Sequence, residues 1–250
     1  MPLKTQTFNE LAKELVKRLE RLHKKHKSEK PMVIGIAGLQ GCGKTTLTSI
    51  IGEQLYLKRF SCVSFSLDDF YLTRDELREK QSNTPKMKHR GVPGTHDIKL
   101  LDSAIRELKS NSIFKIPIYD KSLFNGDGDR SGFKEAKAND FILMEGWFLG
   151  VAGSDLSSKT KELELSKKEL RLYESTWKEV DAWIYLDCDE AFSMKGRKKA
   201  EGALSQLNVE DFLKYMWEWV SPVDLKNSLL KRENCMIIKV FEDHTASFEN

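Results

Sequence analysis

The chain has 250 residues, 40% of them hydrophobic and 32% charged, a composition that suits one α/β domain with an apolar core. Its 41 lysines and arginines stand against 38 acidic residues, so the net charge of +3 does not require a nucleic-acid partner. The four cysteines lack zinc-binding or disulfide spacing, the apolar runs have only the length of strands, and residues 1–30 lack a signal-peptide core. We therefore expect a soluble, cytoplasmic, single-domain protein over residues 1–250, with no membrane and no nucleic-acid partner. The oligomeric state stays open.

Residues 1–30 contain large apolar side chains at helical spacing, namely Phe8, Leu11, Leu15, Leu19 and Leu22. This spacing predicts an amphipathic helix that packs on a core, followed by a basic tail at Lys24–Lys30. Such a charge run suits either a nucleic-acid patch or a solvated helix end, and the second interpretation is the commoner one.

Apolar, strand-like runs alternate with helical patterns along the rest of the chain. The expected strands are Met32–Ala37, Cys62–Leu67, Ile113–Tyr119, Phe141–Glu145, Trp183–Asp187 and Met236–Phe241. The expected helices are Thr45–Leu57, Lys99–Lys109, Lys159–Lys178, Glu190–Leu204 and Val209–Trp219, and Asn125–Gly132 is the clearest loop. This alternation predicts an α/β fold with a mostly parallel central sheet and helices on both faces. Ligands of such sheets bind at the carboxyl ends of the strands.

A glycine-rich turn follows the first expected strand and fits the pattern GxxxxGK[ST] of a nucleotide-binding P-loop. Its backbone N–H groups and the start of the next helix suit the phosphates of a nucleotide, Lys44 supplies a point charge, and the Thr45 hydroxyl suits Mg²⁺. An ordinary glycine-rich turn is the weaker alternative, because the flanking strand and helix are both in place. No NKxD guanine-reading segment is present, which favours ATP. The residues expected to hold ATP are Gly38, Leu39, Gln40, Gly41, Cys42, Gly43, Lys44, Thr45 and Thr46.

Acidic residues end two further strands of the predicted P-loop NTPase fold. Asp68 and Asp69 follow the second strand, where a carboxylate can accept a proton from an attacking hydroxyl and its neighbour can cap a helix. Glu145 ends an apolar strand in the manner of a Walker B acid, which predicts a second Mg²⁺ ligand beside Thr45. A salt-bridged acid is the alternative for Glu145.

Five motifs after the P-loop together resemble the D-glycerate 3-kinases of plant, fungal and cyanobacterial type. These enzymes belong to a group with phosphoribulokinase, uridine kinase and bacterial pantothenate kinase. The motifs are Asp68–Thr73, Arg90–Asp97, Pro117–Ser122, Gly128–Arg130 and Glu145–Gly150. The resemblance runs in order from Met32 to Gly150 and continues more faintly to the C-terminus.

The resemblance implies a role for each matching residue. Asp68 is similar to the catalytic base of the group, and Lys44 and Arg197 complete the implied catalytic set. Arg197 belongs to an implied helical lid over residues 190–205, in which Gly196 replaces the aromatic residue usual in the family. His96 is equally compatible with a packed or capping histidine, and Tyr119 with a strand aromatic. The implied acceptor-binding residues are Asp69, Tyr71, Arg90, His96, Tyr119, Lys121 and Arg130.

The resemblance therefore implies an ATP- and Mg²⁺-dependent kinase of a small hydroxy acid, with D-glycerate as the expected acceptor and 3-phosphoglycerate as product. Arginine and lysine side chains in the acceptor loops suit a carboxylate. A kinase for another hydroxyl acceptor, such as a nucleoside or pantothenate, is one alternative. An ATP-binding regulatory protein without an acceptor is the other.

Overall fold

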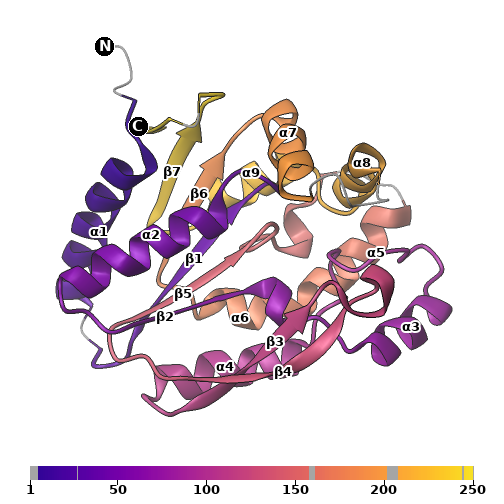
Figure 1. Ribbon diagram of the computed structural model, residues 1–250, viewed down its shortest axis with the longest axis horizontal. Helices are drawn as coiled ribbons and strands as arrows, with labels where there is room; N and C mark the ends of the chain where they lie inside the picture. Colours follow the sequence, from indigo (N-terminus) through magenta and orange to yellow (C-terminus); the bar gives the residue numbers. More distant parts are fainter. Residues whose placement is uncertain (1–4, 27, 158–160, 202–207, 244, 250) are drawn as a thin grey trace.

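A six-stranded sheet in the order β2-β5-β1-β6-β7-β8 forms the centre of the protein (Figure 1). The computed structural model describes residues 5–26, 28–157, 161–201, 208–243 and 245–249. All strands except β8 run parallel to their neighbours, and β8 is antiparallel to β7. The expected mostly parallel sheet is therefore confirmed. The strand bounds are Met32–Gly38 (β1), Cys62–Ser66 (β2), Phe141–Gly146 (β5), Ala182–Asp187 (β6), Cys235–Val240 (β7) and Ala246–Phe248 (β8).

Helices cover both faces of the sheet, because successive strand residues point to opposite sides. In β5, Phe141 and Leu143 belong to the apolar cluster shared with the first two helices, whereas Ile142 and Met144 belong to the cluster on the other face. The first face carries α1 (Phe8–Lys25) and α2 (Lys44–Leu57). The second cluster includes side chains of α4 (Ile98–Lys109), α6 (Glu174–Lys178), α8 (Val209–Trp219) and α9 (Pro222–Leu230).

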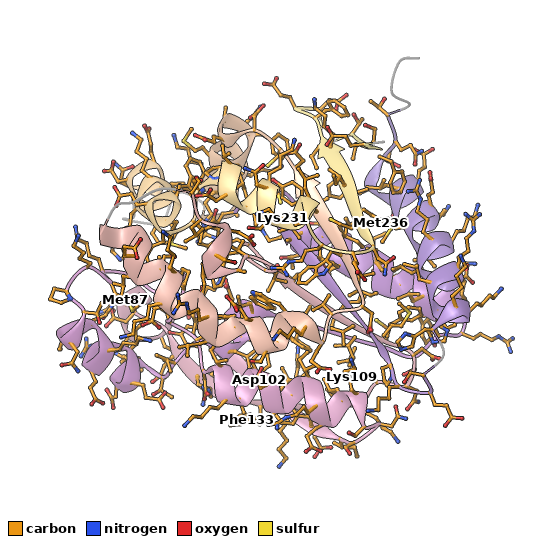
Figure 2. The ribbon with its side chains drawn as sticks, turned by 180° about the vertical axis from the view of Figure 1, so that it is seen from behind. Met87, Asp102, Lys109, Phe133, Lys231 and Met236 are labelled. Carbon is orange, nitrogen blue, oxygen red and sulfur yellow. The ribbon has the colours of Figure 1, made fainter. Side chains whose placement is uncertain are left out.

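Polar contacts join α4 to α6 across this second layer. Figure 2 shows Asp102 and Lys109 of α4 from behind. Thr176 of α6 donates a hydrogen bond to Asp102, and Lys109 Nζ forms an ion pair with Glu179 at 3.0 Å. These contacts fix α4, and α4 in turn packs beneath the short 3₁₀ turn Leu67–Phe70 that follows β2.

A separate two-stranded antiparallel sheet is formed by β3 (Phe114–Asp120) and β4 (Asp129–Ala136). The sequence interpretation placed the first of these strands in the parallel sheet and a loop at Asn125–Gly132, so both the partner of β3 and the start of β4 are corrections. Pro117 lacks a backbone N–H and is therefore tolerated in a short ribbon but not in a central strand.

Three more helices complete the described chain: α3 (Arg74–Asn83), α5 (Lys161–Leu170) and α7 (Glu190–Glu201). The helix expected at Lys159–Lys178 divides into α5, a 3₁₀ turn at Arg171–Tyr173 and α6. Parts of the sequence predictions, at residues 27, 159–160 and 202–205, lie outside the described residues. None of the described helices combines the length and the apolar character needed to cross a membrane.

The order of the strands determines where a ligand can bind. β1 lies between β5 and β6: the chain passes from β1 to β2 on one side, returns through β5, and continues from β5 to β6 on the other side of β1. This arrangement makes the carboxyl end of β1 a topological switch point, the usual ligand position in open parallel sheets. The residues following β1, β2 and β5 therefore meet at one edge of the sheet.

Packing of α1 on α2 depends on leucines that are wholly buried. We expect Leu15→Ala to lower the free energy of unfolding by about 2–5 kcal/mol, because the substitution leaves a cavity between these helices. Lys13→Ala on the exposed side of the same helix is the matched control and should change the free energy of unfolding by less than about 0.5 kcal/mol. Urea unfolding followed by circular dichroism measures both values, and equal effects of the two substitutions would contradict this packing.

Candidate active site

The P-loop joins β1 to α2 at the switch point. Gly41 and Gly43 have φ angles of 76° and 95°, in the left-handed region that glycine adopts without steric cost. Gly43 is the N-cap of α2 and provides no capping side chain, so the first N–H groups of the helix remain suited to an anion. Lys44 is buried, and its Nζ donates hydrogen bonds to the carbonyl oxygens of Gly38 and Leu39 at 2.9 and 2.8 Å. The loop therefore has the geometry of a phosphate cradle with a cation at its rim.

Cys42 lies in the same positive environment. Burial alone would raise the pKa of the Cys42 thiol, but a hydrogen bond with Cys188 and the charge of Lys44 outweigh it and lower the pKa. The direction of this shift is a second sign that the loop favours negative charge.

Thr45 and Glu145 bring two oxygen ligands together beside the loop. Thr45 Oγ1 donates a hydrogen bond to Glu145 Oε1 at 3.0 Å, and the β5 register places Glu145 opposite Ser66 of β2 and Ile36 of β1. Burial raises the pKa of Glu145, and the nearby charge of Lys44 only partly offsets this effect. A buried carboxylate next to a hydroxyl suits Mg²⁺, which binds oxygen and completes its shell with water and phosphate. The two predicted metal ligands therefore fit the ion.

Asp68 and Asp69 have different environments in the 3₁₀ turn after β2. Asp69 Oδ2 accepts a hydrogen bond from the Ser66 backbone N–H at 2.9 Å and so completes a capping box. Asp68 Oδ1 accepts from the Tyr71 hydroxyl at 2.8 Å, and Asp68 Oδ2 forms an ion pair with Lys121 Nζ at 2.6 Å. Burial would raise the pKa of Asp68, but Lys121 and Tyr71 hold it well below its usual range. Asp68 is therefore an ionised carboxylate facing the cavity.

A cavity of about 1250 Å³ opens in front of Asp68. Six of the residues expected from the sequence line it: Gln40, Asp68, Tyr71, Arg90, Lys121 and Arg197. Arg74 and Arg78 of α3 and Lys88 also line it, and the sequence interpretation missed them. The signal was present as two arginines one helical turn apart directly after the motif Asp68–Thr73, but no helix was expected there. The lining is consequently richer in positive charge than the motifs implied.

Four expected acceptor residues, Asp69, His96, Tyr119 and Arg130, are not among the residues that line the cavity. Burial lowers the pKa of His96 to about 3, so its ring is neutral, and Nδ1 lies 2.8 Å from the Tyr173 hydroxyl. Arg130 Nη2 donates to the Tyr71 carbonyl oxygen at 3.2 Å and pairs with Asp97 at 3.4 Å. His96, Tyr119 and Arg130 contact Tyr71, and the contact of all four residues with an acceptor stays a prediction.

Arg90 lines the cavity and also binds the backbone of the loop that forms one of its walls. Its Nη1 donates to the backbone carbonyl oxygens of Gly126 and Asp127 at 2.7 and 2.6 Å. Arg74 and Arg78 form ion pairs with the Asp127 side chain at 3.1 and 2.9 Å. Three arginines therefore fasten the loop between β3 and β4 to the acceptor side of the cavity.

Helix α7, which carries the expected lid residue Arg197, packs directly on the P-loop. Ser193 Oγ donates to the Gln40 carbonyl oxygen at 2.6 Å, and Arg197 reaches the cavity one turn further on. A Cβ atom built at Gly196 would overlap the carbonyl oxygen of Gly41. The glycine that departs from the family pattern is therefore the residue that permits this close approach. It brings the backbone of α7 against the phosphate loop.

The fold and the P-loop define a P-loop kinase, and comparison with known proteins agrees. The model of the phosphoribulokinase/uridine kinase family matches residues 33–158. An uncharacterized kinase, mug58, of Schizosaccharomyces pombe is 35% identical over 210 residues, which cover 74% of this chain and 76% of that protein. The chain belongs to the phosphoribulokinase/uridine kinase family of ATP-dependent P-loop kinases.

Two similar proteins are named for the acceptor they phosphorylate, and each matches the chain over a smaller share of its length or at lower identity than mug58 does. Chloroplastic D-glycerate 3-kinase of Arabidopsis thaliana is 34% identical over 192 residues, covering 70% of this chain but only 42% of the plant protein. The structure of D-glycerate 3-kinase from Cryptococcus neoformans aligns with a TM-score of 0.79 over 95% of this chain and 99% of that one, at 24% identity. Phosphoribulokinase from Rhodobacter spheroides aligns with a TM-score of 0.55 over 85% of this chain and 71% of that one. These structures show that the fold is shared.

The contact between Gly196 and Gly41 generates a prediction about nucleotide binding. Gly196→Ala should weaken ATP binding roughly tenfold, because the methyl group must move either the P-loop or α7, while the melting temperature changes little. Titration calorimetry with ATP measures the affinity. Lys199→Ala, on the exposed side of the same helix, is the control and should bind ATP as the unmodified protein does. Normal ATP affinity in Gly196→Ala would show that the contact is dispensable.

Proposed function

We propose that the chain is a D-glycerate 3-kinase, which transfers the γ-phosphate of ATP to the 3-hydroxyl group of D-glycerate. The observation that carries this proposal is the Asp68–Lys121 pair, a carboxylate and a cation 2.6 Å apart in the cavity next to the P-loop. A hydroxy acid offers one group to each: its hydroxyl to Asp68 and its carboxylate to Lys121. The plant relative named D-glycerate 3-kinase supports the same acceptor.

Each residue of the site has a distinct task in this reaction. The P-loop amides and Lys44 bind the ATP phosphates, with Lys44 exchanging its carbonyl partners for phosphate oxygens. Thr45 and Glu145 would hold Mg²⁺, which neutralises charge on the phosphate oxygens when bound. Asp68 orients the acceptor hydroxyl and receives its proton, and Arg197 stabilises charge on the transferred group from the lid side.

The charge of the cavity favours an acid over a nucleoside as the acceptor. Its lining includes Arg74, Arg78, Lys88, Arg90, Lys121 and Arg197, against the carboxylates of Asp68 and Asp127. The sugar of a nucleoside presents only neutral hydroxyl groups and offers the Lys121 ammonium no second carboxylate besides Asp68. A small anionic acceptor is therefore the better match to this surface.

A panel of acceptors tests the proposal directly. Purified protein with MgATP would be assayed for ADP release with D-glycerate, L-glycerate, uridine and pantothenate, and the product would be identified by ³¹P NMR. We expect D-glycerate to give the highest kcat/KM, with the phosphate on the 3-oxygen. Phosphorylation of a nucleoside or pantothenate without a response to glycerate would overturn the acceptor. Slow ATP hydrolysis that no acceptor changes would favour the regulatory alternative.

Substitutions at Asp68 and Lys44 separate transfer from ATP binding. Asp68→Asn should retain ATP affinity but lose about 10²–10³-fold in turnover, because the amide orients the hydroxyl poorly and cannot take its proton. Lys44→Ala should nearly abolish turnover and should also weaken ATP binding, since its Nζ lies at the phosphate cradle. Steady-state kinetics and ATP calorimetry distinguish the two variants, and normal turnover in Asp68→Asn would remove that residue from the catalytic role.

A further inference from the structure

Both oxygens of the Asp68 carboxylate are engaged by the protein itself. The Tyr71 hydroxyl donates to Oδ1 at 2.8 Å, and the Lys121 ammonium lies 2.6 Å from Oδ2. Short contacts between an ammonium and a carboxylate are among the stronger hydrogen bonds in proteins. These two donors occupy two of the roughly four acceptor positions of the carboxylate, so a hydroxyl group that approaches Asp68 either shares an oxygen with one of them or displaces it.

Lys121 is the donor that can leave. Tyr71 is buried, its ring stacks on His96 at 4.6 Å between centroids, and the edge of Tyr119 packs against it at 5.0 Å. The Lys121 side chain is 45% exposed and lies in the turn after β3, at the wall of the cavity. Its four-carbon stem lets the ammonium swing without any movement of the backbone.

The arginines on this wall are held by other partners. Arg74 and Arg78 pair with Asp127, and Arg90 donates to the carbonyl oxygens of Gly126 and Asp127. Among the ion pairs that the structure describes, the one made by Asp68 is with Lys121. At Asp68 itself, the cation that an entering anion meets is therefore Lys121; Lys88 also lines the cavity but forms none of the described ion pairs with Asp68.

We propose that Lys121 is a charge-selective latch, which covers Asp68 until the carboxylate of the acceptor draws its ammonium away and frees Oδ2 for the acceptor hydroxyl. The inference rests on the proposed function, because it takes Asp68 as the proton acceptor. The exchange itself breaks no covalent bond. In the transfer that follows, the bond from the γ-phosphorus to ADP breaks, a bond to the acceptor oxygen forms, and the hydroxyl proton passes to Asp68.

The latch distinguishes acids from neutral alcohols and from water. When an acid enters, Lys121 exchanges one carboxylate for another, so the number of ion pairs is conserved. A neutral alcohol or a water molecule can displace Lys121 from Asp68 only by leaving the ammonium without a counter-ion. The terminal oxygens of a three-carbon hydroxy acid lie on the order of 5 Å apart, which lets one molecule reach Asp68 and the displaced Lys121 together. Lys121 consequently selects a short, anionic acceptor and protects ATP from hydrolysis before that acceptor arrives.

Removal of the Lys121 charge tests the latch. In Lys121→Met, D-glycerate should bind roughly tenfold or more weakly by calorimetry without nucleotide, because a charge-assisted hydrogen bond is lost. Phosphorylation of D-glyceramide, the neutral analogue of the same size, and hydrolysis of ATP without acceptor should both rise in absolute rate by roughly tenfold, because Asp68 is uncovered. Lys121→Arg, which keeps the charge, should resemble the unmodified protein in both respects.

Two further variants identify the origin of these changes. Lys115→Met removes a lysine from the exposed side of β3, outside the cavity, and should alter none of the measured values. Adding Asp68→Asn to Lys121→Met should abolish the gain in hydrolysis, because that gain passes through the Asp68 carboxylate.

The outcomes separate the latch from the proposed function. Unchanged or lower rates with D-glyceramide and with water in Lys121→Met would overturn the latch, even if D-glycerate remains the preferred acceptor. Failure of the unmodified protein to phosphorylate D-glycerate would overturn the acceptor. The hydrolysis rate of Lys121→Met would still decide whether Lys121 restrains Asp68.

Discussion

The parallel register of β2, β5 and β1 is the constraint on which the site depends. It sets Glu145 opposite Ser66 on one side and Ile36 on the other, so the chain following each strand starts from the same edge. Thr45, two residues into the helix after the P-loop, reaches Glu145 at 3.0 Å for this reason, although 100 residues separate them in sequence. Asp68, two residues beyond β2, faces the same edge. A shift of one residue in either ladder would turn Glu145 to the opposite face and separate these oxygens.

The site has a nucleotide half and an acceptor half, built by different elements. The P-loop, Thr45 and Glu145 come from the central strands, and α7 closes on them through the backbone contact of Gly196 with Gly41. The acceptor half comes from α3 and from the β3–β4 ribbon, which lies outside the main sheet. Asp68 stands between the halves, since its turn follows β2 while its ion pair reaches the ribbon at Lys121. This division means that the acceptor wall can change without disturbing the cradle for the phosphates.

The sequence was sufficient to predict the strand–loop–helix context of the P-loop and the neighbouring acid Glu145, because this information is local. A glycine pattern between a strand and a helix predicts the geometry of the P-loop directly. Acids at the ends of buried strands lie at the same edge in any parallel sheet. The ribbon was misplaced because its partner strand, beginning at Asp129, is mostly polar and follows a turn with left-handed backbone at Phe124 and Asn125. Arg74 and Arg78 were missed because their place in the cavity depends on where α3 packs. His96 and Arg130 illustrate the converse: their residue types suggested anion binding, but burial and local partners draw them towards Tyr71 and Asp97.

The cations of the acceptor wall show why positive charge alone does not define an anion site. Arg90 donates to two backbone carbonyl oxygens, and Arg74 and Arg78 share one carboxylate. These partners stabilise the cavity wall, but they also make the three arginines less available to a bound anion. An anion binds most favourably where a cation can exchange one carboxylate partner for another. Binding to an arginine that keeps its present partner gains little free energy, because the cost of desolvation offsets the attraction. Lys121 satisfies that condition, being half-exposed, flexible and paired with the one carboxylate that the reaction needs uncovered. The proposed specificity therefore depends on the exchange of an ion pair, and so on the partners of each charge more than on the number of charges.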